Sequence, residues 1–148
     1  MTKIRITKEF SFDAAHILPH YDGKCRNIHG HTYKLQVTVL GTPCTDENSP
    51  KCGMVLDFSL FKTAIKEPII DAFDHALIVP QNSHLENLKN IQQDGKFIEL
   101  PFQPTCENMI LYFVRIIQKY IPKDVELFSV RLYETPTSFA EWFASDNQ

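Results

Sequence analysis

Two segments near the N-terminus alternate apolar and polar residues, and histidines lie on the apolar face of both. The apolar parity of residues 4–16 ends at His16, and that of residues 29–39 includes His29 and His31. Side chains two residues apart leave the same face of a strand, so these segments predict an antiparallel hairpin with one buried face. If the first strand stays regular as far as His16, three imidazoles converge at one end of this hairpin.

The rest of the chain predicts an α+β fold. Apolar residues at spacings of three and four predict a helix over 58–72, interrupted at Pro68, and a second helix that begins after Thr105. Alternation resumes at 127–132, and a turn at 135–137 leads to a last strand. This order predicts a four-stranded antiparallel sheet with the two helices inserted between its second and third strands. Its apolar edges are open to pairing, so we expect a homo-oligomer.

Length and composition restrict the class of protein. The chain has 148 residues, which predicts a single domain over 1–148. Its net charge of −3 does not suggest a nucleic-acid surface, and no apolar run reaches the roughly 20 residues of a membrane span. The first residues lack the core of a signal peptide, so we expect a cytoplasmic protein without a membrane partner. Four cysteines are too few for a disulfide scaffold and are expected to be thiols.

The three histidines predict a metal site. Buried together, imidazoles repel one another when protonated and are hard to satisfy when neutral, unless an ion shares their lone pairs. Three histidine ligands without a nearby fourth describe a catalytic zinc with an open position. Cys25, between Lys24 and Arg26, has two readings: a thiolate that accepts a proton, or a fourth ligand that closes a structural site. The sequence leaves both open.

Three carboxylates are further candidates. Asp74 precedes His75 and can orient its imidazole for proton transfer, although an isolated Asp-His pair is weak evidence. Glu134 ends an apolar strand face, where it can pair with an amidine or guanidine edge of a substrate, unless the strand has already bent into the turn. Glu107 lies in the first turn of the second helix, as a helix-dipole partner or a ligand contact.

Six motifs occur in order along the chain. They are residues 12–16 (FDAAH), 25–31 (CRNIHGH), 53–58 (GMVLDF), 74–75 (DH), 104–108 (PTCEN) and 134–138 (ETPTS). Together they resemble the family of 6-pyruvoyl-tetrahydropterin and 6-carboxy-tetrahydropterin synthases. The resemblance implies the tunnelling fold, in which subunits join their sheets into a trimeric barrel and two rings usually stack as a hexamer. This would satisfy the open edges of the sheet.

The resemblance also implies roles for individual residues. His16, His29 and His31 would hold zinc, and Cys25 would be the catalytic proton acceptor. Asp74 and His75 would assist Cys25 across a subunit boundary. Glu134 would be a catalytic or relay carboxylate, with Glu107 and Thr105 as candidate contacts to the pterin.

Within the family, the spacing Cys-x3-His-Gly-His resembles the bacterial 6-carboxy enzyme of queuosine biosynthesis. That resemblance implies a lyase that converts 7,8-dihydroneopterin triphosphate and water to 6-carboxy-5,6,7,8-tetrahydropterin, acetaldehyde and triphosphate. The alternatives are a 6-pyruvoyl-tetrahydropterin synthase and a non-catalytic zinc-stabilised oligomer. Two segments depart from the family pattern: residues 76–103 are long, and the loop that contains Cys44 and Cys52 is unusual.

Overall fold

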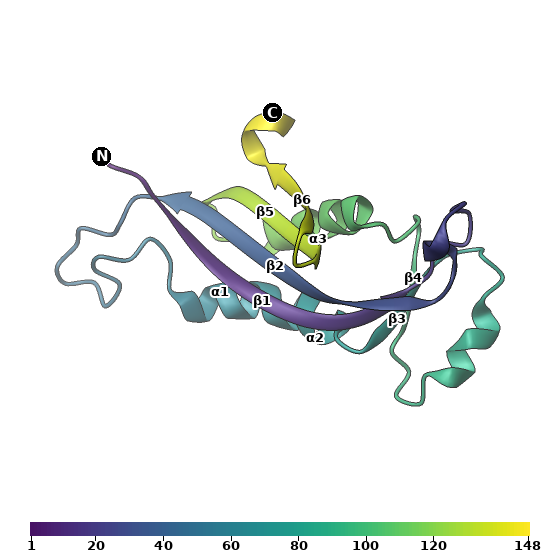
Figure 1. Ribbon diagram of the computed structural model, residues 1–148. Helices are drawn as coiled ribbons and strands as arrows, with labels where there is room; N and C mark the ends of the chain where they lie inside the picture. Colours follow the sequence, from purple (N-terminus) through teal and green to yellow (C-terminus); the bar gives the residue numbers. More distant parts are fainter.

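Two long strands, β1 (Ile4–His16) and β2 (His29–Gly41), form the centre of the sheet in the computed structural model, which describes residues 1–148. Their antiparallel ladder runs without a break from the Ile4–Gly41 pair to the His16–His29 pair. The two strands curve together across the molecule (Figure 1). The predicted hairpin is thus confirmed, and β1 stays regular as far as His16.

The sheet has six strands in the order β4-β3-β1-β2-β5-β6, which corrects the prediction of four. Strands β5 (Glu126–Thr135) and β6 (Ser138–Phe143) continue the sheet beyond β2 in antiparallel fashion, as predicted. On the other side, β3 (Ala76–Pro80) pairs parallel to β1, and β4 (Phe97–Leu100) pairs parallel to β3. The sheet is therefore curled and mixed rather than antiparallel throughout, and the α+β class is confirmed.

The first helical region changes its winding at a proline. Helix α1 (Phe58–Ile65) begins after Asp57, whose side chain accepts a hydrogen bond from the backbone N–H of Ser59. A wider π-helical stretch, η2 (Lys66–Ile70), contains Pro68 and leads to the short α2 (Asp71–Phe73). Proline has no N–H to donate to the preceding turn, so the predicted interruption occurs as a change of winding rather than a break.

Helix α3 (Cys106–Tyr120) begins as predicted at Thr105, whose hydroxyl accepts a hydrogen bond from the backbone N–H of Asn108. The apolar face of the helix packs on the β-sheet together with α1 and η2. The face that the sheet turns toward these helices carries the completely buried side chains of β2, which are Tyr33, Leu35, Val37 and Val39. The histidines of β2 share this parity and extend the same face toward one end of the strand.

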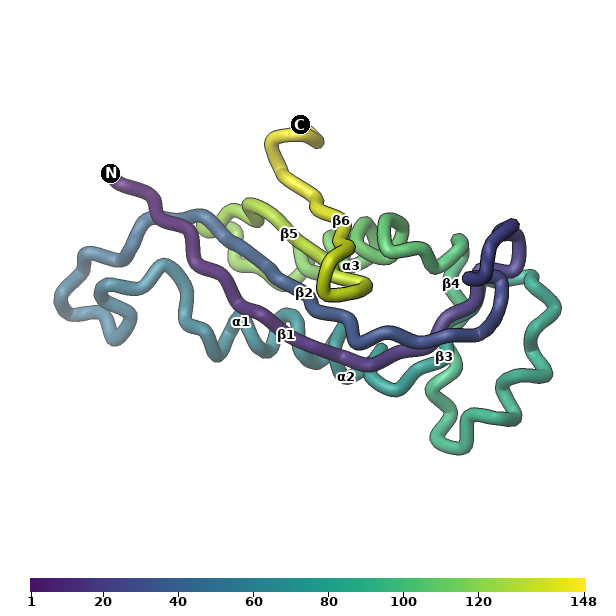
Figure 2. The backbone as a smooth tube through the Cα atoms, viewed as in Figure 1, coloured from purple at the N-terminus to yellow at the C-terminus, as the bar shows by residue number.

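Two irregular segments project at opposite ends of the molecule (Figure 2). Residues 42–57 connect β2 to α1, and residues 81–96 connect β3 to β4 and contain the 3-10 helix η3 (Glu86–Ile91). Two further 3-10 helices are η1 (Lys24–Arg26), between β1 and β2, and η4 (Ala144–Asn147), at the C-terminus. None of the helices has the length and apolar character needed to cross a bilayer.

Candidate metal centre and active site

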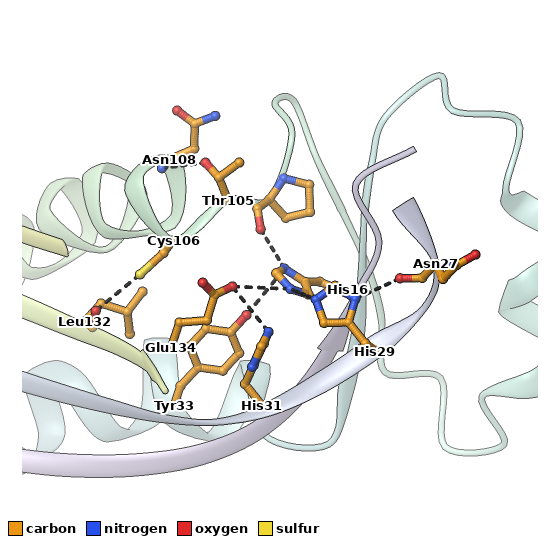
Figure 3. Close-up of polar contacts among 11 residues, drawn as sticks. His16, Asn27, His29, His31, Tyr33, Thr105, Cys106, Asn108, Leu132 and Glu134 are labelled. Carbon is orange, nitrogen blue, oxygen red and sulfur yellow. Dashed lines mark hydrogen bonds and ion pairs between the residues drawn. The ribbon is translucent and has the colours of Figure 1, made fainter. Parts of the chain in front are cut away.

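The β1–β2 ladder brings the three predicted histidines together. One nitrogen from each of His16, His29 and His31 contributes to a group whose atoms all lie within 4.8 Å of one another. His16 is completely buried and the other two are half-buried. Figure 3 shows the three rings converging above the strands. The register explains this convergence, because His16 pairs with His29 and Ala14 pairs with His31.

Two backbone carbonyls orient two of these rings. The Nδ1–H of His16 donates to the carbonyl oxygen of Pro104 at 2.8 Å, and the Nδ1–H of His29 donates to that of Asn27 at 2.8 Å. Since a carbonyl oxygen only accepts, each neutral ring must carry its lone pair on Nε2. The two Nε2 atoms are 2.9 Å apart. Two lone pairs at this separation repel, unless a proton or a metal ion lies between them.

The inner nitrogen of the third ring makes no hydrogen bond and has the Glu134 carboxylate nearby. The Nε2 atom of His31 is buried and has no hydrogen-bond partner. Oε1 of Glu134 lies 3.3 Å from this atom and 3.4 Å from Nε2 of His16. An unsatisfied buried polar atom costs about 1–3 kcal/mol. Converging lone pairs beside a carboxylate fit a divalent cation, and the carbonyl contacts to the far side of two rings are typical of metal-binding histidines.

Burial keeps the imidazoles of His16 and His31 neutral, which is the form that binds metal. Desolvation lowers the pKa of His16 to about 4, and the neighbouring histidines lower it further against the opposing hydrogen bond to Pro104. Desolvation also lowers the pKa of His31, although the Glu134 carboxylate acts in the opposite direction. Near pH 7 neither ring requires the loss of a proton before it can bind a cation.

Cys25 lies in η1, in the connection between the two strands that carry the histidines. Its side chain is half-buried and free, and its carbonyl oxygen accepts a hydrogen bond from the N–H of Leu18 at 3.0 Å. The group of mutually close ligand atoms contains the three histidines and no cysteine. This geometry supports a centre with an open position over a closed site with a sulfur ligand.

Glu134 reaches the centre from β5. This strand extends to Thr135, and its pairing with β6 shifts register between Tyr133 and Thr135. A bulge of this kind re-aims the side chain that it contains. Figure 3 shows the Glu134 carboxylate directed toward His16 and His31. The alternative that the strand has already bent into the turn is therefore wrong.

Asp74 and His75 do not join the histidine centre within one chain. Oδ2 of Asp74 lies 3.1 Å from Nδ1 of His75, and the His75 side chain is 76% exposed. His75 lines a hollow of about 500 Å³ together with Asp13, Thr32 and His31. Asp13 and Thr32 have the opposite parity to His31 in the ladder, so their side chains leave the other face of the sheet. Neither Asp74 nor His75 belongs to the group of mutually close ligand atoms within one chain.

The two predicted pterin contacts lie at the start of α3. The Thr105 hydroxyl is engaged as the helix cap, and the Glu107 side chain is exposed in the first turn. The buried Cys106 between them is a thiol, as expected, and donates from Sγ to the carbonyl oxygen of Leu132 at 3.2 Å. Neither Thr105 nor Glu107 has a polar contact with the histidines.

The groups that orient the histidines could not be found by sequence reasoning. The acceptors in Pro104 and Asn27 are backbone carbonyls, which every residue possesses. The buried Tyr33 places its hydroxyl 3.4 Å from Nδ1 of His16, but its position in an apolar alternation suggested only a core residue. These contacts depend on tertiary placement and have no residue signature.

A curled mixed sheet with helices on one face and a three-histidine centre defines the class: an α+β protein with a candidate metal site built on a β-hairpin. The protein-family model described as 6-pyruvoyl tetrahydropterin synthase matches residues 5–145. The chain therefore belongs to this family, as the motifs predicted.

Relatives and solved structures agree with this assignment. The 6-carboxy-5,6,7,8-tetrahydropterin synthase of Haemophilus influenzae is 40% identical over 141 residues, with 93% of this chain and 97% of the relative covered. The protein of the same name from Synechocystis is 34% identical, with 94% and 92% covered. The structure of the Caenorhabditis elegans 6-pyruvoyl tetrahydropterin synthase has a TM-score of 0.68 and 25% identity, with 97% of each chain covered. An uncharacterized protein from Wolinella succinogenes, at 21% identity and a TM-score of 0.78, shares the fold over 97% of this chain and 99% of that one.

Proposed function

We propose that this chain is a zinc-dependent 6-carboxy-5,6,7,8-tetrahydropterin synthase of the queuosine pathway. It converts 7,8-dihydroneopterin triphosphate and water to 6-carboxy-5,6,7,8-tetrahydropterin, acetaldehyde and triphosphate. The relatives named for this activity support the proposal over nearly the whole chain. The observation that carries it is the convergence of Nε2 atoms from His16 and His29 beside the unpartnered Nε2 of His31.

Each candidate residue has a separate task in this reaction. His16, His29 and His31 would hold zinc, which would supply a Lewis acid for negative charge on the side-chain oxygens of the substrate. Cys25 transfers protons between the side-chain carbons and solvent, aided by the positive charges of Lys24 and Arg26. Glu134 accepts hydrogen bonds from the pterin or relays a proton, because its carboxylate borders the centre. Thr105 and Glu107 border the pterin at the start of α3.

A complete site requires a second copy of the chain. Asp74 and His75 do not contact the histidine centre of their own chain, so a neighbouring subunit would bring its pair to that centre for the pair to assist Cys25. The edge strands β4 and β6 are unpaired on their outer sides within one chain and allow sheets to join. A trimeric barrel, or a hexamer of two such rings, satisfies both requirements.

The test of the reaction is incubation of the zinc-loaded protein with 7,8-dihydroneopterin triphosphate. We expect acetaldehyde and a product with the mass of the 6-carboxy compound. A product that forms without acetaldehyde identifies the pyruvoyl synthase, the activity named in the family description and for the Caenorhabditis structure. No conversion at full zinc content contradicts both enzymes. A strong thiolate-to-cobalt band in the cobalt-substituted protein would then identify a non-catalytic site closed by Cys25.

A further inference from the structure

Lys96 lies at the end of segment 81–96, for which the proposed reaction has no use so far. Its ammonium group donates to two backbone carbonyl oxygens, those of Asp71 at 2.9 Å and Asp74 at 2.7 Å. Lys96 is half-buried and immediately precedes β4. The Lys96 ammonium therefore contacts the helical turn that precedes His75 at both of its ends, Asp71 and Asp74.

This turn needs such a donor because the helix stops abruptly. After α2, Asp74 is extended (φ −62°, ψ 127°) and His75 has a φ of 62°, in the left-handed region that a residue with a Cβ adopts at a cost. The last carbonyls of a helix have no N–H partner within it and carry partial negative charge. The Lys96 ammonium supplies this missing partner and matches the sign of the charge.

The opposite side of the pair is fixed to β1 by a single residue. The N–H of Asp13 donates to Oδ1 of Asp74 at 2.9 Å, and the N–H of His75 donates to the carbonyl oxygen of Asp13 at 2.6 Å. Asp74 and His75 are thus held between the backbone of β1 and the side chain of Lys96. The Asp13 contacts are backbone groups, so Lys96 is the part of this support that a substitution can remove.

Lys96 is itself held in place by its neighbours. Its carbonyl oxygen accepts hydrogen bonds from the N–H of Leu77 at 2.9 Å and from the Gln92 side chain at 3.1 Å. Lys96, Gln92 and His75 also line one hollow of about 480 Å³. Segment 81–96 therefore lies beside the exposed His75 imidazole and places the Lys96 ammonium against the turn that precedes His75.

We propose that Lys96 is a positioning residue: by binding the carbonyls of Asp71 and Asp74, it fixes the orientation of the Asp74–His75 pair for its contact with a neighbouring subunit's active site. The inference rests on the proposed function, in which this pair assists Cys25. Lys96 does not touch the substrate in this role. Its loss acts through the pair and leaves the zinc centre of the same chain unchanged.

The test compares lysine-to-methionine variants of two lysines that both contact Asp71. Lys96→Met keeps the apolar stem and removes the donors. We expect kcat to fall on the order of 10- to 100-fold, since misplacement of a catalytic group by about 1 Å has effects of this size. We expect zinc content and KM to remain near wild-type values. The control is Lys66→Met, which removes an exposed ion pair to the Asp71 side chain (2.7 Å) and leaves kcat unchanged. Lys96→Arg keeps a long cationic donor and restores most of kcat.

A second readout does not depend on turnover. Amide hydrogen exchange at Asp13 and His75 reports the two hydrogen bonds that hold the pair to β1. We expect both amides to exchange on the order of tenfold faster in Lys96→Met, and at the wild-type rate in Lys66→Met. If the wild-type protein does not convert the pterin, the proposed function fails while the exchange rates still test Lys96.

Two results overturn the inference. The first is a Lys96→Met variant with wild-type kcat and wild-type exchange at Asp13 and His75. The second is a loss of protection spread evenly over the β1–β2 ladder, with KM or zinc content changed, because a general structural role would produce it.

Discussion

Zinc should stabilise the folded chain through its three histidines, by an amount that can be calculated. At a free zinc concentration of 100 times Kd, binding to the native state alone contributes about 2.7 kcal/mol. Unfolding entropy near 60 °C is about 2.1 cal/mol/K per residue, or about 0.3 kcal/mol/K for a chain of this length. Zinc added to the metal-free protein should therefore raise Tm by about 9 °C.

The variant that tests this origin is His31→Ala. It removes the ring whose Nε2 has no hydrogen-bond partner. The hydrogen bonds of His16 and His29 to backbone carbonyls remain. Loss of a group that merely orients a ligand typically costs 10- to 100-fold in metal affinity, so loss of the ligand should cost about 100-fold or more. At the same free zinc concentration, the stabilisation then falls to about 0.4 kcal/mol and the shift to about 1 °C.

The measurement is differential scanning calorimetry of the chelated protein at several free zinc concentrations. His84→Ala is the matched control, because His84 lies in a turn outside the histidine group and its loss should leave the 9 °C shift unchanged. An equal shift in His31→Ala and the wild type would place the bound zinc elsewhere. A smaller shift in His84→Ala would have the same meaning.

Three further predictions follow from named contacts. Cys25→Ala and His75→Ala should each be inactive with full zinc content. Oligomers assembled from equal amounts of the two variants should recover about a quarter of wild-type activity, because each site takes its two groups from different chains. No recovery would place both groups in one chain. Thr105→Ala should lower the unfolding free energy by about 1 kcal/mol in urea titrations through loss of the α3 cap. The Lys51 ammonium, and then the Ser59 N–H, hold the pKa of Asp57 well below its ordinary value of 3.8. This stabilisation is present above pH 3.8 and lost as pH falls toward the lowered pKa, so Asp57→Asn should flatten the acid limb of a stability–pH curve.

The histidine centre was predictable because strand geometry determines it locally. A residue two positions away lies on the same face, so the placement of His29 and His31 follows from β2 alone. His16 joins them because β1 stays regular to its last residue. The β1–β2 ladder brings the three residues together, whereas the orientation of the His16 ring depends on the distant Pro104 carbonyl.

The two additional strands could not be predicted by the same reasoning. β3 is buried at every position, so its sequence ALIVP has no alternation to detect. β4 has only four residues, and nothing in its sequence indicates the strand with which it pairs. Parallel pairing joins segments through a long connection, and here that connection is the polar segment 81–96. The contacts of Lys96 could not be predicted either, because their acceptors are backbone carbonyls, which every residue possesses.

Gly30, between the two histidines of β2, shows how closely the fold controls the geometry of the centre. A Cβ at this position would lie 3.3 Å from the carbonyl oxygen of Ala14, so any larger residue must shift β1 or β2 by a few tenths of an ångström. Metal–ligand distances tolerate about 0.2 Å. The shift would fall on the strands that hold His16, His29 and His31, at the end of the ladder where no further pairs absorb it. Glycine at residue 30 thus serves the metal centre through strand spacing, although it contributes no ligand and its φ is one that any residue can adopt.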